Sequence, residues 1–316
     1  MNPTSSRRLR ANALLLLASA IWGFAFVAQR VGAESVGPFT FNAVRFAMGA
    51  AVLVPVVWFL DRRRRLPRPV RAAATRAVIV PGLITGALLA AAVGMQQVAM
   101  SHTTAGNAAF ITGLYMVFVP LVAAFRGHRS SWSTLAGIGF ALVGLYFLAV
   151  GDGFRIGLGD GIVLASTLVW TAQILVIEHY SRRLSALRFA IAQFAWCAVL
   201  SVPAALLLDD APFTGLAVGL IPLLYGGLIS VGIAYTLQII AQRDALASHA
   251  ALIMSTEALF GALGGALLLG ENMGPRGYFG AALMAGGIVV AQWRTGREVP
   301  PQPVVASRPE SATTLT

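Results

Sequence analysis

Runs of about twenty apolar residues recur from one end of this 316-residue chain to the other. Each run is long enough to cross a hydrocarbon core of roughly 30 Å as an α-helix, since a helix rises ~1.5 Å per residue. Inside lipid, a helix satisfies its own backbone N–H and C=O groups. The chain is 57% hydrophobic and only 11% charged, whereas a soluble domain is roughly one quarter charged. We therefore predict an all-α membrane protein without a sizeable soluble domain.

Ten spans can be delimited, and the short links between them make neighbouring helices antiparallel. The first run follows basic residues and resembles a signal peptide with a cleavage site near Ala20. We favour a permanent span, because the apolar run continues through Val27 and its later half recurs further along the chain. The predicted spans are residues 9–28, 38–60, 75–100, 105–125, 135–150, 159–180, 187–208, 216–241, 248–269 and 277–293.

The distribution of arginine predicts the orientation of the chain, because all 23 basic residues are arginine. With ten spans and a cytoplasmic N-terminus, 19 of these 23 arginines fall on the cytoplasmic side, as the positive-inside rule requires. Both termini are then cytoplasmic, and residues 294–316, rich in Pro, Ser and Thr, form a disordered tail. The arginine run at 62–65 is either a topology anchor beside anionic headgroups, which is the simpler interpretation, or a binding patch for a partner or lipid.

Similarity between the two halves of the chain predicts an internal repeat. The aligned pairs include Trp22 with Trp170, Phe41 with Phe189 and Phe46 with Phe194 at an offset of 148, Gln97 with Gln238 and Gly86 with Gly227 at 141, and Ala108 with Ala250 at 142. Each half holds five spans, an odd number, so the second half enters the membrane in the opposite orientation. We predict an inverted-topology repeat of residues 1–150 and 151–293, an architecture of secondary transporters that bind solute between the halves.

Three stretches resemble a known family: "AIWGFAFVAQRVGAESVGPFTFNAVRF", "TTAGNAAFITGLYMVFVPLVAAF" and "ALFGALGGALLLGENMGPRGYFGAALMAGGIVV". They are similar to the EamA-type carriers of the drug/metabolite transporter (DMT) superfamily, over nearly the whole chain. The resemblance implies a bacterial inner-membrane carrier with a 5+5 inverted repeat, often an exporter of amino acids or other small metabolites. One departure is that the Gly-Glu pair ending the fourth span of such halves is matched by Gly270–Glu271, but not by Gly127-His128.

Two ionisable residues lie deep within predicted spans, where lipid offers no partner. Arg45 is either an anion-binding or gating charge of a cavity, or part of a structural ion pair or helix clamp. Glu257 is either a proton-coupling site or counter-charge for a solute amine, or a protonated carboxyl bonded to a neighbouring helix. The repeat aligns Arg45 with Gln193 and Glu257 with Tyr115, so neither charge recurs, which favours function. The sequence does not show whether the two charges pair.

We expect a solute cavity between the halves. Two repeat-related tryptophans suit a solute with an apolar part, although they are also explained as packing or interface anchors. The predicted cavity residues are Trp22, Phe26, Arg45, Gln97, Asn107, Tyr115, Trp170, Gln173, Gln193, Tyr235, Gln238 and Glu257.

The sequence lacks the motifs of an ATP-driven pump and of an enzyme. It contains no GxxxxGK[ST] loop, no HExxH pair and a single cysteine, Cys197, so we expect no cofactor and no metal. The expected partners are the lipid bilayer and a small solute, not nucleic acid. The oligomeric state stays open, and a monomer is compatible with the sequence.

These observations predict a secondary transporter that exports small metabolites by alternating access. One arginine and one glutamate match a zwitterion such as an amino acid. The alternative is a broad-specificity drug efflux carrier.

Overall fold

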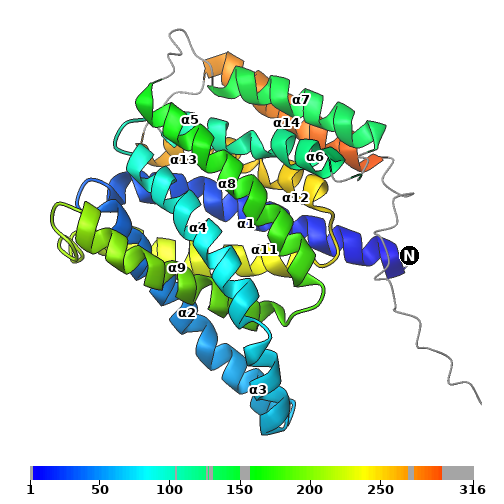
Figure 1. Cartoon of the computed structure of the whole chain (residues 1–316). Helices are drawn as coiled ribbons and strands as arrows, with labels where there is room; N and C mark the ends of the chain where they lie inside the picture. Colours follow the sequence, from blue (N-terminus) through cyan, green and yellow to red (C-terminus); the bar gives the residue numbers. More distant parts are fainter. Residues whose placement is uncertain are drawn as a thin grey trace, which may run out of the picture.

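The computed structural model describes residues 3–103, 105–125, 127, 131–149, 157–269 and 274–293. These residues form helices joined by turns, with no β-strand among them, which confirms the predicted all-α class. Figure 1 shows the helices packed side by side, with α3 at the far end of the hairpin between α2 and α4. The predicted tail at 294–316 lies outside the described residues.

The chain contains seven helices in its first half and eight helical segments in its second. The first half comprises α1 (Pro3–Gly32), α2 (Pro38–Arg63), α3 (Arg68–Arg76), α4 (Ile79–Ala99), α5 (Ala105–Gly113), α6 (Tyr115–Phe125) and α7 (Trp132–Ala149). The second comprises α8 (Leu158–Ser181), α9 (Ala186–Leu208), α10 (Leu220–Leu224), the π-helix η1 (Tyr225–Tyr235), α11 (Thr236–Ala241), α12 (Ala247–Met254), α13 (Glu257–Leu269) and α14 (Gly274–Trp293).

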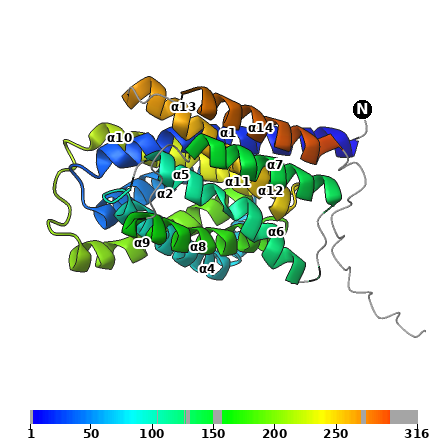
Figure 2. The same cartoon turned by 90° about the horizontal axis from the view of Figure 1, so that it is seen from above.

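Eight segments of the described chain are long and apolar enough to cross a membrane. Several of them combine two or more helices, because α3 runs on into α4, α5 into α6, α10 through η1 into α11, and α12 into α13. The remaining pair, α7 and α14, pack along each other at one side of the bundle (Figures 1 and 2). The apolar stretch of α7, Trp132–Phe147, is shorter than the other eight. The count of ten spans therefore stays a prediction.

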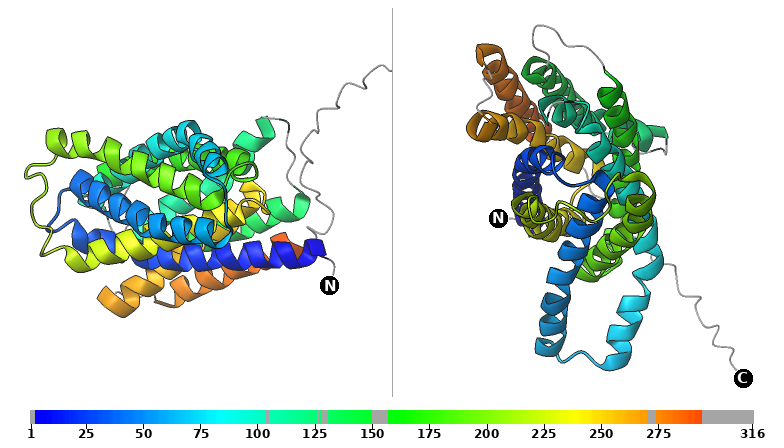
Figure 3. Two further views of the ribbon diagram at one scale, coloured as in Figure 1. Left: turned by 90° about the horizontal axis from the view of Figure 1, so that it is seen from below. Right: turned by 90° about the vertical axis from the view of Figure 1, so that its left-hand side faces the viewer.

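Helix packing follows the internal repeat. The repeat aligns α1 with α8, α2 with α9 and α7 with α14. Helix α1 packs on η1, α12 and α13 of the second half, and α8 packs on the corresponding α4, α5 and α6 of the first half. The aligned helices α2 and α9 pack on each other, as do α7 and α14. Figure 3 shows α2 and α9 in the same region of the bundle. Exchanging the two halves thus reproduces the main contacts.

The aligned helices α2 and α9 run antiparallel and are tied at both ends by an acid. At one end, Asp209 accepts hydrogen bonds from the backbone N–H groups of Phe39 (3.2 Å) and Thr40 (2.7 Å) at the start of α2. A carboxylate at this place satisfies donors that have no partner within the helix. At the other end, Asp61 of α2 forms an ion pair with Arg188 near the start of α9. Each helix thus ends on an acid bound to the beginning of the other.

Two repeat-related glycines allow close backbone contacts between the halves. A Cβ atom on Gly86 of α4 would lie 2.8 Å from the carbonyl oxygen of Gln193 in α9. A Cβ atom on Gly227 of η1 would lie 3.1 Å from the carbonyl oxygen of Arg45 in α2. Small residues permit such approach in membrane helices, where dispersion contacts drive packing.

We expect Gly86→Ala to destabilise the fold by about 1–3 kcal/mol, because the added methyl group overpacks the contact with α9. The measurement is thermal unfolding in detergent. Gly139→Ala is the matched control, since a Cβ atom there meets nothing within 4 Å. Equal unfolding temperatures for the two variants would contradict the packing argument.

Candidate solute-binding site

A cavity of about 40 Å³ lies inside the bundle. One water molecule needs roughly 10–15 Å³ of such volume, so in this conformation the space holds a few waters. Both halves of the chain contribute to its wall. The lining residues are Trp22, Phe26, Gln29, Arg45, Gln96, Thr112, Tyr115, Trp170, Ile174, Ser230, Tyr235, Gln238, Met254 and Glu257.

Eight of the twelve residues predicted from the sequence line this cavity: Trp22, Phe26, Arg45, Tyr115, Trp170, Tyr235, Gln238 and Glu257. Three others are buried elsewhere. Gln97 donates to the carbonyl of Gln29 (3.1 Å), and Gln173 donates to Gln193 (3.4 Å). The side chain of Asn107 lies outside the described residues.

The cavity adjoins two interrupted helices that the repeat relates to each other. The fourth and ninth spans, predicted as continuous, break between α5 and α6 and between α12 and α13. At the first break the N–H of Leu114 bonds the carbonyl of Ile111, and at the second the N–H of Thr256 bonds that of Ile253. These i→i−3 bonds tighten the chain at positions that are 142 residues apart. Discontinuous helices of this kind form solute sites in many secondary transporters.

Hydroxyl groups from repeat-related positions support both breaks. Thr167 of α8 lies 3.1 Å from the carbonyl oxygen of Ile111, and Ser19 of α1 hydrogen-bonds the hydroxyl of Thr256. Ser19 and Thr167 are 148 residues apart, the same offset that aligns the two tryptophans. Aligned positions thus supply a hydroxyl to each break, although one reaches a carbonyl oxygen and the other a hydroxyl.

The residues beside the breaks and on the facing helices make four repeat-related pairs in the cavity wall. They are Trp22 with Trp170, Phe26 with Ile174, Thr112 with Met254, and Tyr115 with Glu257. Ile174, Thr112 and Met254 were not predicted from the sequence, yet the repeat offsets point to Ile174 as the partner of Phe26. Gln29 and Ser230 were missed because nothing in the sequence separates a cavity position from an ordinary buried one.

Arg45 is only 2% exposed, and its guanidinium has no counter-ion among the residues that the structure describes. Its Nε donates to Asn42 (3.0 Å), and its Cζ lies 5.3 Å from the ring centroid of Phe41 and 5.1 Å from that of Phe46. No acidic side chain of the described chain lies within 4 Å of it; the ion pairs found are Arg182–Glu178 and Asp61–Arg188. The cation is thus held by an amide and two aromatic faces, and it borders the cavity.

Glu257 is 5% exposed and lies on the same cavity without pairing with Arg45. It is the first residue of α13, and its Oε1 accepts a hydrogen bond from the phenol of Tyr115 (2.9 Å), the first residue of α6. The two residues that follow the two breaks therefore meet each other across the repeat. The question left open by the sequence is answered in this conformation: the two deep charges are not bound to each other.

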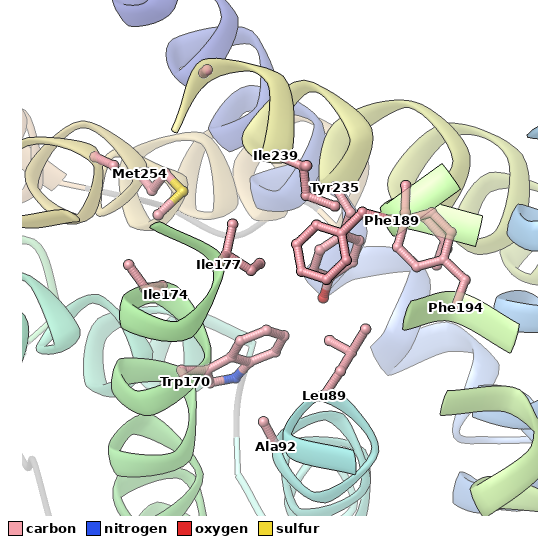
Figure 4. Close-up of a cluster of buried hydrophobic side chains, with 14 of the residues drawn as sticks. Leu89, Ala92, Trp170, Ile174, Ile177, Phe189, Phe194, Tyr235, Ile239 and Met254 are labelled. Atoms are coloured by element: carbon pink, nitrogen blue, oxygen red, sulfur yellow. The ribbon is translucent and has the colours of Figure 1, made fainter. Parts of the chain in front are cut away.

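Tyr235 is the centre of an aromatic cluster between these charges. Its ring centroid lies 4.7 Å from that of Trp22, 6.1 Å from that of Trp170, 5.9 Å from that of Phe46 and 6.0 Å from that of Phe194. Figure 4 shows its hydroxyl directed into the space beside Trp170. It ends the π-helix, an uncommon element that is frequent at functional sites. The predicted eighth span gave no sign of this element.

One side of the cavity carries a completed hydrogen-bond chain. The indole N–H of Trp170 donates to Gln96 (3.1 Å), Gln96 donates to Gln29 (3.1 Å), and Gln29 donates to the carbonyl of Ala25 (3.3 Å). The repeat mate of Trp170 differs, since the indole nitrogen of Trp22 is buried and has no partner among the described residues. The two tryptophans are equivalent in position but differ in their hydrogen bonding.

The hydroxyl of Thr167 is shared between the carbonyl oxygen of Val163 in its own helix (2.8 Å) and that of Ile111 before the break (3.1 Å). We expect Thr167→Val to destabilise the protein by about 0.5–1.5 kcal/mol, the usual net worth of one hydrogen bond, because it removes this shared contact between α8 and the break before α6. Thr171→Val is the control, since that hydroxyl bonds only within its own helix, to the carbonyl of Thr167. Thermal unfolding in detergent measures both. A loss no larger for Thr167→Val than for Thr171→Val would show that the tie is not stabilising.

Comparison with known proteins places this architecture among membrane transporters. The model of the EamA-like transporter family matches residues 9–150 and again residues 157–292. The chain therefore belongs to the EamA-like transporter family, within the DMT superfamily, and carries two EamA domains. This is a family of transporters and not of enzymes, and it implies a multi-pass protein in a lipid bilayer that moves a small solute.

The relatives give the fold and the general class. An uncharacterized transporter of Archaeoglobus fulgidus is 29% identical over 290 residues, which cover 91% of this chain and 87% of that protein. A solved crystal structure superposes with a TM-score of 0.70 at 20% identity, covering 89% of this chain and 96% of that one. At that identity the likeness establishes the fold alone.

Proposed function

We propose that this protein is a secondary transporter that exports small zwitterionic metabolites, amino acids or similar solutes, across a bacterial inner membrane by alternating access. The observation that carries the proposal is the pair of opposite charges on one cavity, each buried and neither bound to the other. A buried charge is costly in a membrane unless something compensates it. A zwitterion supplies a carboxylate for Arg45 and an ammonium group for Glu257.

Alternating access is supported by the packing of the two halves. Their main contacts recur on exchange of halves, and the two interrupted helices lie on the cavity. An inverted repeat lets the inward- and outward-facing states be related by a pseudo-two-fold axis in the membrane plane. The proposal includes ten spans with both termini in the cytoplasm, which the arginine distribution favours. Glu257 is the proposed proton-coupling residue.

Broad drug efflux is a second candidate. The aromatic side chains of Trp22, Phe26, Tyr115, Trp170 and Tyr235 on the cavity wall would accept apolar cations as well as amino acids. The lone arginine argues against it, because a buried positive charge repels a cationic drug.

A counterflow screen in proteoliposomes loaded with each amino acid, with and without a pH gradient, tests the proposed solute class. We expect uptake of at least one amino acid and none of lipophilic cations. Uptake of cations alone would favour the drug-efflux alternative, and no uptake of any amino acid would overturn the proposed substrate class.

Charge-removing variants test the two binding roles. We expect Arg45→Met to weaken solute affinity by about tenfold or more, because a hydrogen bond to a charged group is worth about 1.5–3 kcal/mol. Gln193→Met is its repeat-matched control and lies off the cavity.

We expect Glu257→Gln to abolish stimulation of transport by a pH gradient, because the amide cannot exchange a proton. Full gradient-driven transport by Glu257→Gln, or unchanged affinity of a folded Arg45→Met, would refute the corresponding role.

A further inference from the structure

Two polar side chains on the cavity wall are buried without a hydrogen-bond partner. Thr112 is 3% exposed and Gln238 is 2% exposed. The hydroxyl oxygen of Thr112 and the side-chain oxygen of Gln238 make no hydrogen bond to any residue that the structure describes. A buried polar atom left unsatisfied costs about 1–3 kcal/mol. Such atoms in a native structure call for an explanation, and a ligand that completes them is one.

Two other glutamines on the wall are already occupied. The side-chain oxygen of Gln96 accepts from Trp170, and that of Gln29 accepts from Gln96. Glu257 uses Oε1 for Tyr115, and no hydrogen bond to its second carboxylate oxygen is found in the described part of the chain. Glu257, Thr112 and Gln238 therefore each keep an acceptor available on one cavity.

These acceptors belong to three elements that meet at the cavity: Thr112 to α5, Gln238 to α11 and Glu257 to α13. Thr112 is the last residue but one of α5 and lies three residues before Tyr115, so that it is one turn from the residue that binds Glu257. Gln238 lies one turn beyond Tyr235, whose ring contacts Trp22. The repeat mates of these two side chains, Met254 and Gln97, do not reproduce the arrangement: one is apolar, and the other is off the cavity.

We infer that Glu257, Thr112 and Gln238 form a three-acceptor site for a primary ammonium group. This inference rests on the proposed function and makes it narrower, because it states which cationic group the solute carries. A primary ammonium has three N–H donors, one for each acceptor. Each N-methylation removes one donor and leaves one buried acceptor unsatisfied, so the site discriminates against methylated amines. Sites built to hydrogen-bond a donor reject analogues that lack it far more strongly than apolar pockets reject size differences.

The test measures the apparent affinity of the wild-type carrier for four solutes. They are the amino acid with the strongest counterflow signal and its N-methyl, N,N-dimethyl and N,N,N-trimethyl derivatives. All four keep the carboxylate and the side chain. We expect each methyl group to lower apparent affinity by about tenfold. In the wild type, the first methyl group leaves one buried acceptor without a donor. Thr112→Val and Gln238→Met each remove one such acceptor. We therefore expect each variant to reduce the ratio of the affinities for the unmethylated and monomethylated solutes by about tenfold.

Two control variants carry the same substitutions away from the cavity. Thr236→Val removes another buried hydroxyl without a partner, and Gln97→Met changes the repeat mate of Gln238. We expect both controls to keep the wild-type ratio of the affinities for the unmethylated and monomethylated solutes. Equal affinity of the wild type for all four solutes, or an unchanged ratio in folded Thr112→Val and Gln238→Met, would overturn the ammonium site alone. Absence of uptake for every amino acid would overturn the proposed function, and the ammonium site with it.

Discussion

The position of Arg45 depends on a contact between backbones. Its carbonyl oxygen lies against Gly227 of the π-helix, so α2 approaches η1 more closely than any side chain would allow. The repeat-equivalent contact joins Gln193 and Gly86. Because both contacts involve main-chain atoms, the scaffold is indifferent to which side chain occupies the position. One half places an arginine there and the other a glutamine, with the same backbone support.

The same separation of scaffold and chemistry recurs throughout the cavity. Trp22 and Trp170 occupy equivalent places, but only Trp170 has its N–H satisfied. Tyr115 and Glu257 follow equivalent breaks, and one donates to the other. An inverted repeat with identical side chains would make a cavity whose two ends are the same. Substituting one member of each pair turns that cavity into a polar one with a cationic end and an acidic end.

The fold and part of the site were predictable, for reasons that differ between residues. Apolar runs predict the helices and the placement of arginine predicts the links, since a lipid bilayer requires apolar spans and disfavours charges within them. Arg45 and Glu257 could be identified because a charge in an apolar run is conspicuous. Gln97, Gln173 and Gln193 could not be distinguished from Gln238, because all four are amides within spans and only packing decides which one reaches the cavity. The breaks at Leu114 and Thr256 escaped prediction. Gly113 precedes the first, but it does not stand out in a chain with 33 glycines, and no proline or glycine adjoins the second. Side-chain hydroxyls from neighbouring helices support both breaks.

The π-helix has a consequence for how Tyr235 is oriented. Its turns close i→i+5 instead of i→i+4, so relaxing one turn to α-helical bonding frees about one residue of chain. Everything beyond that turn then rotates by roughly 100° about the helix axis. Such a register change breaks few hydrogen bonds and unfolds nothing. For η1 it would carry the ring of Tyr235, and Gln238 beyond it, around the helix to face a different neighbour. A solute in contact with Tyr235 would therefore bind the π-helical and the relaxed register of this segment unequally.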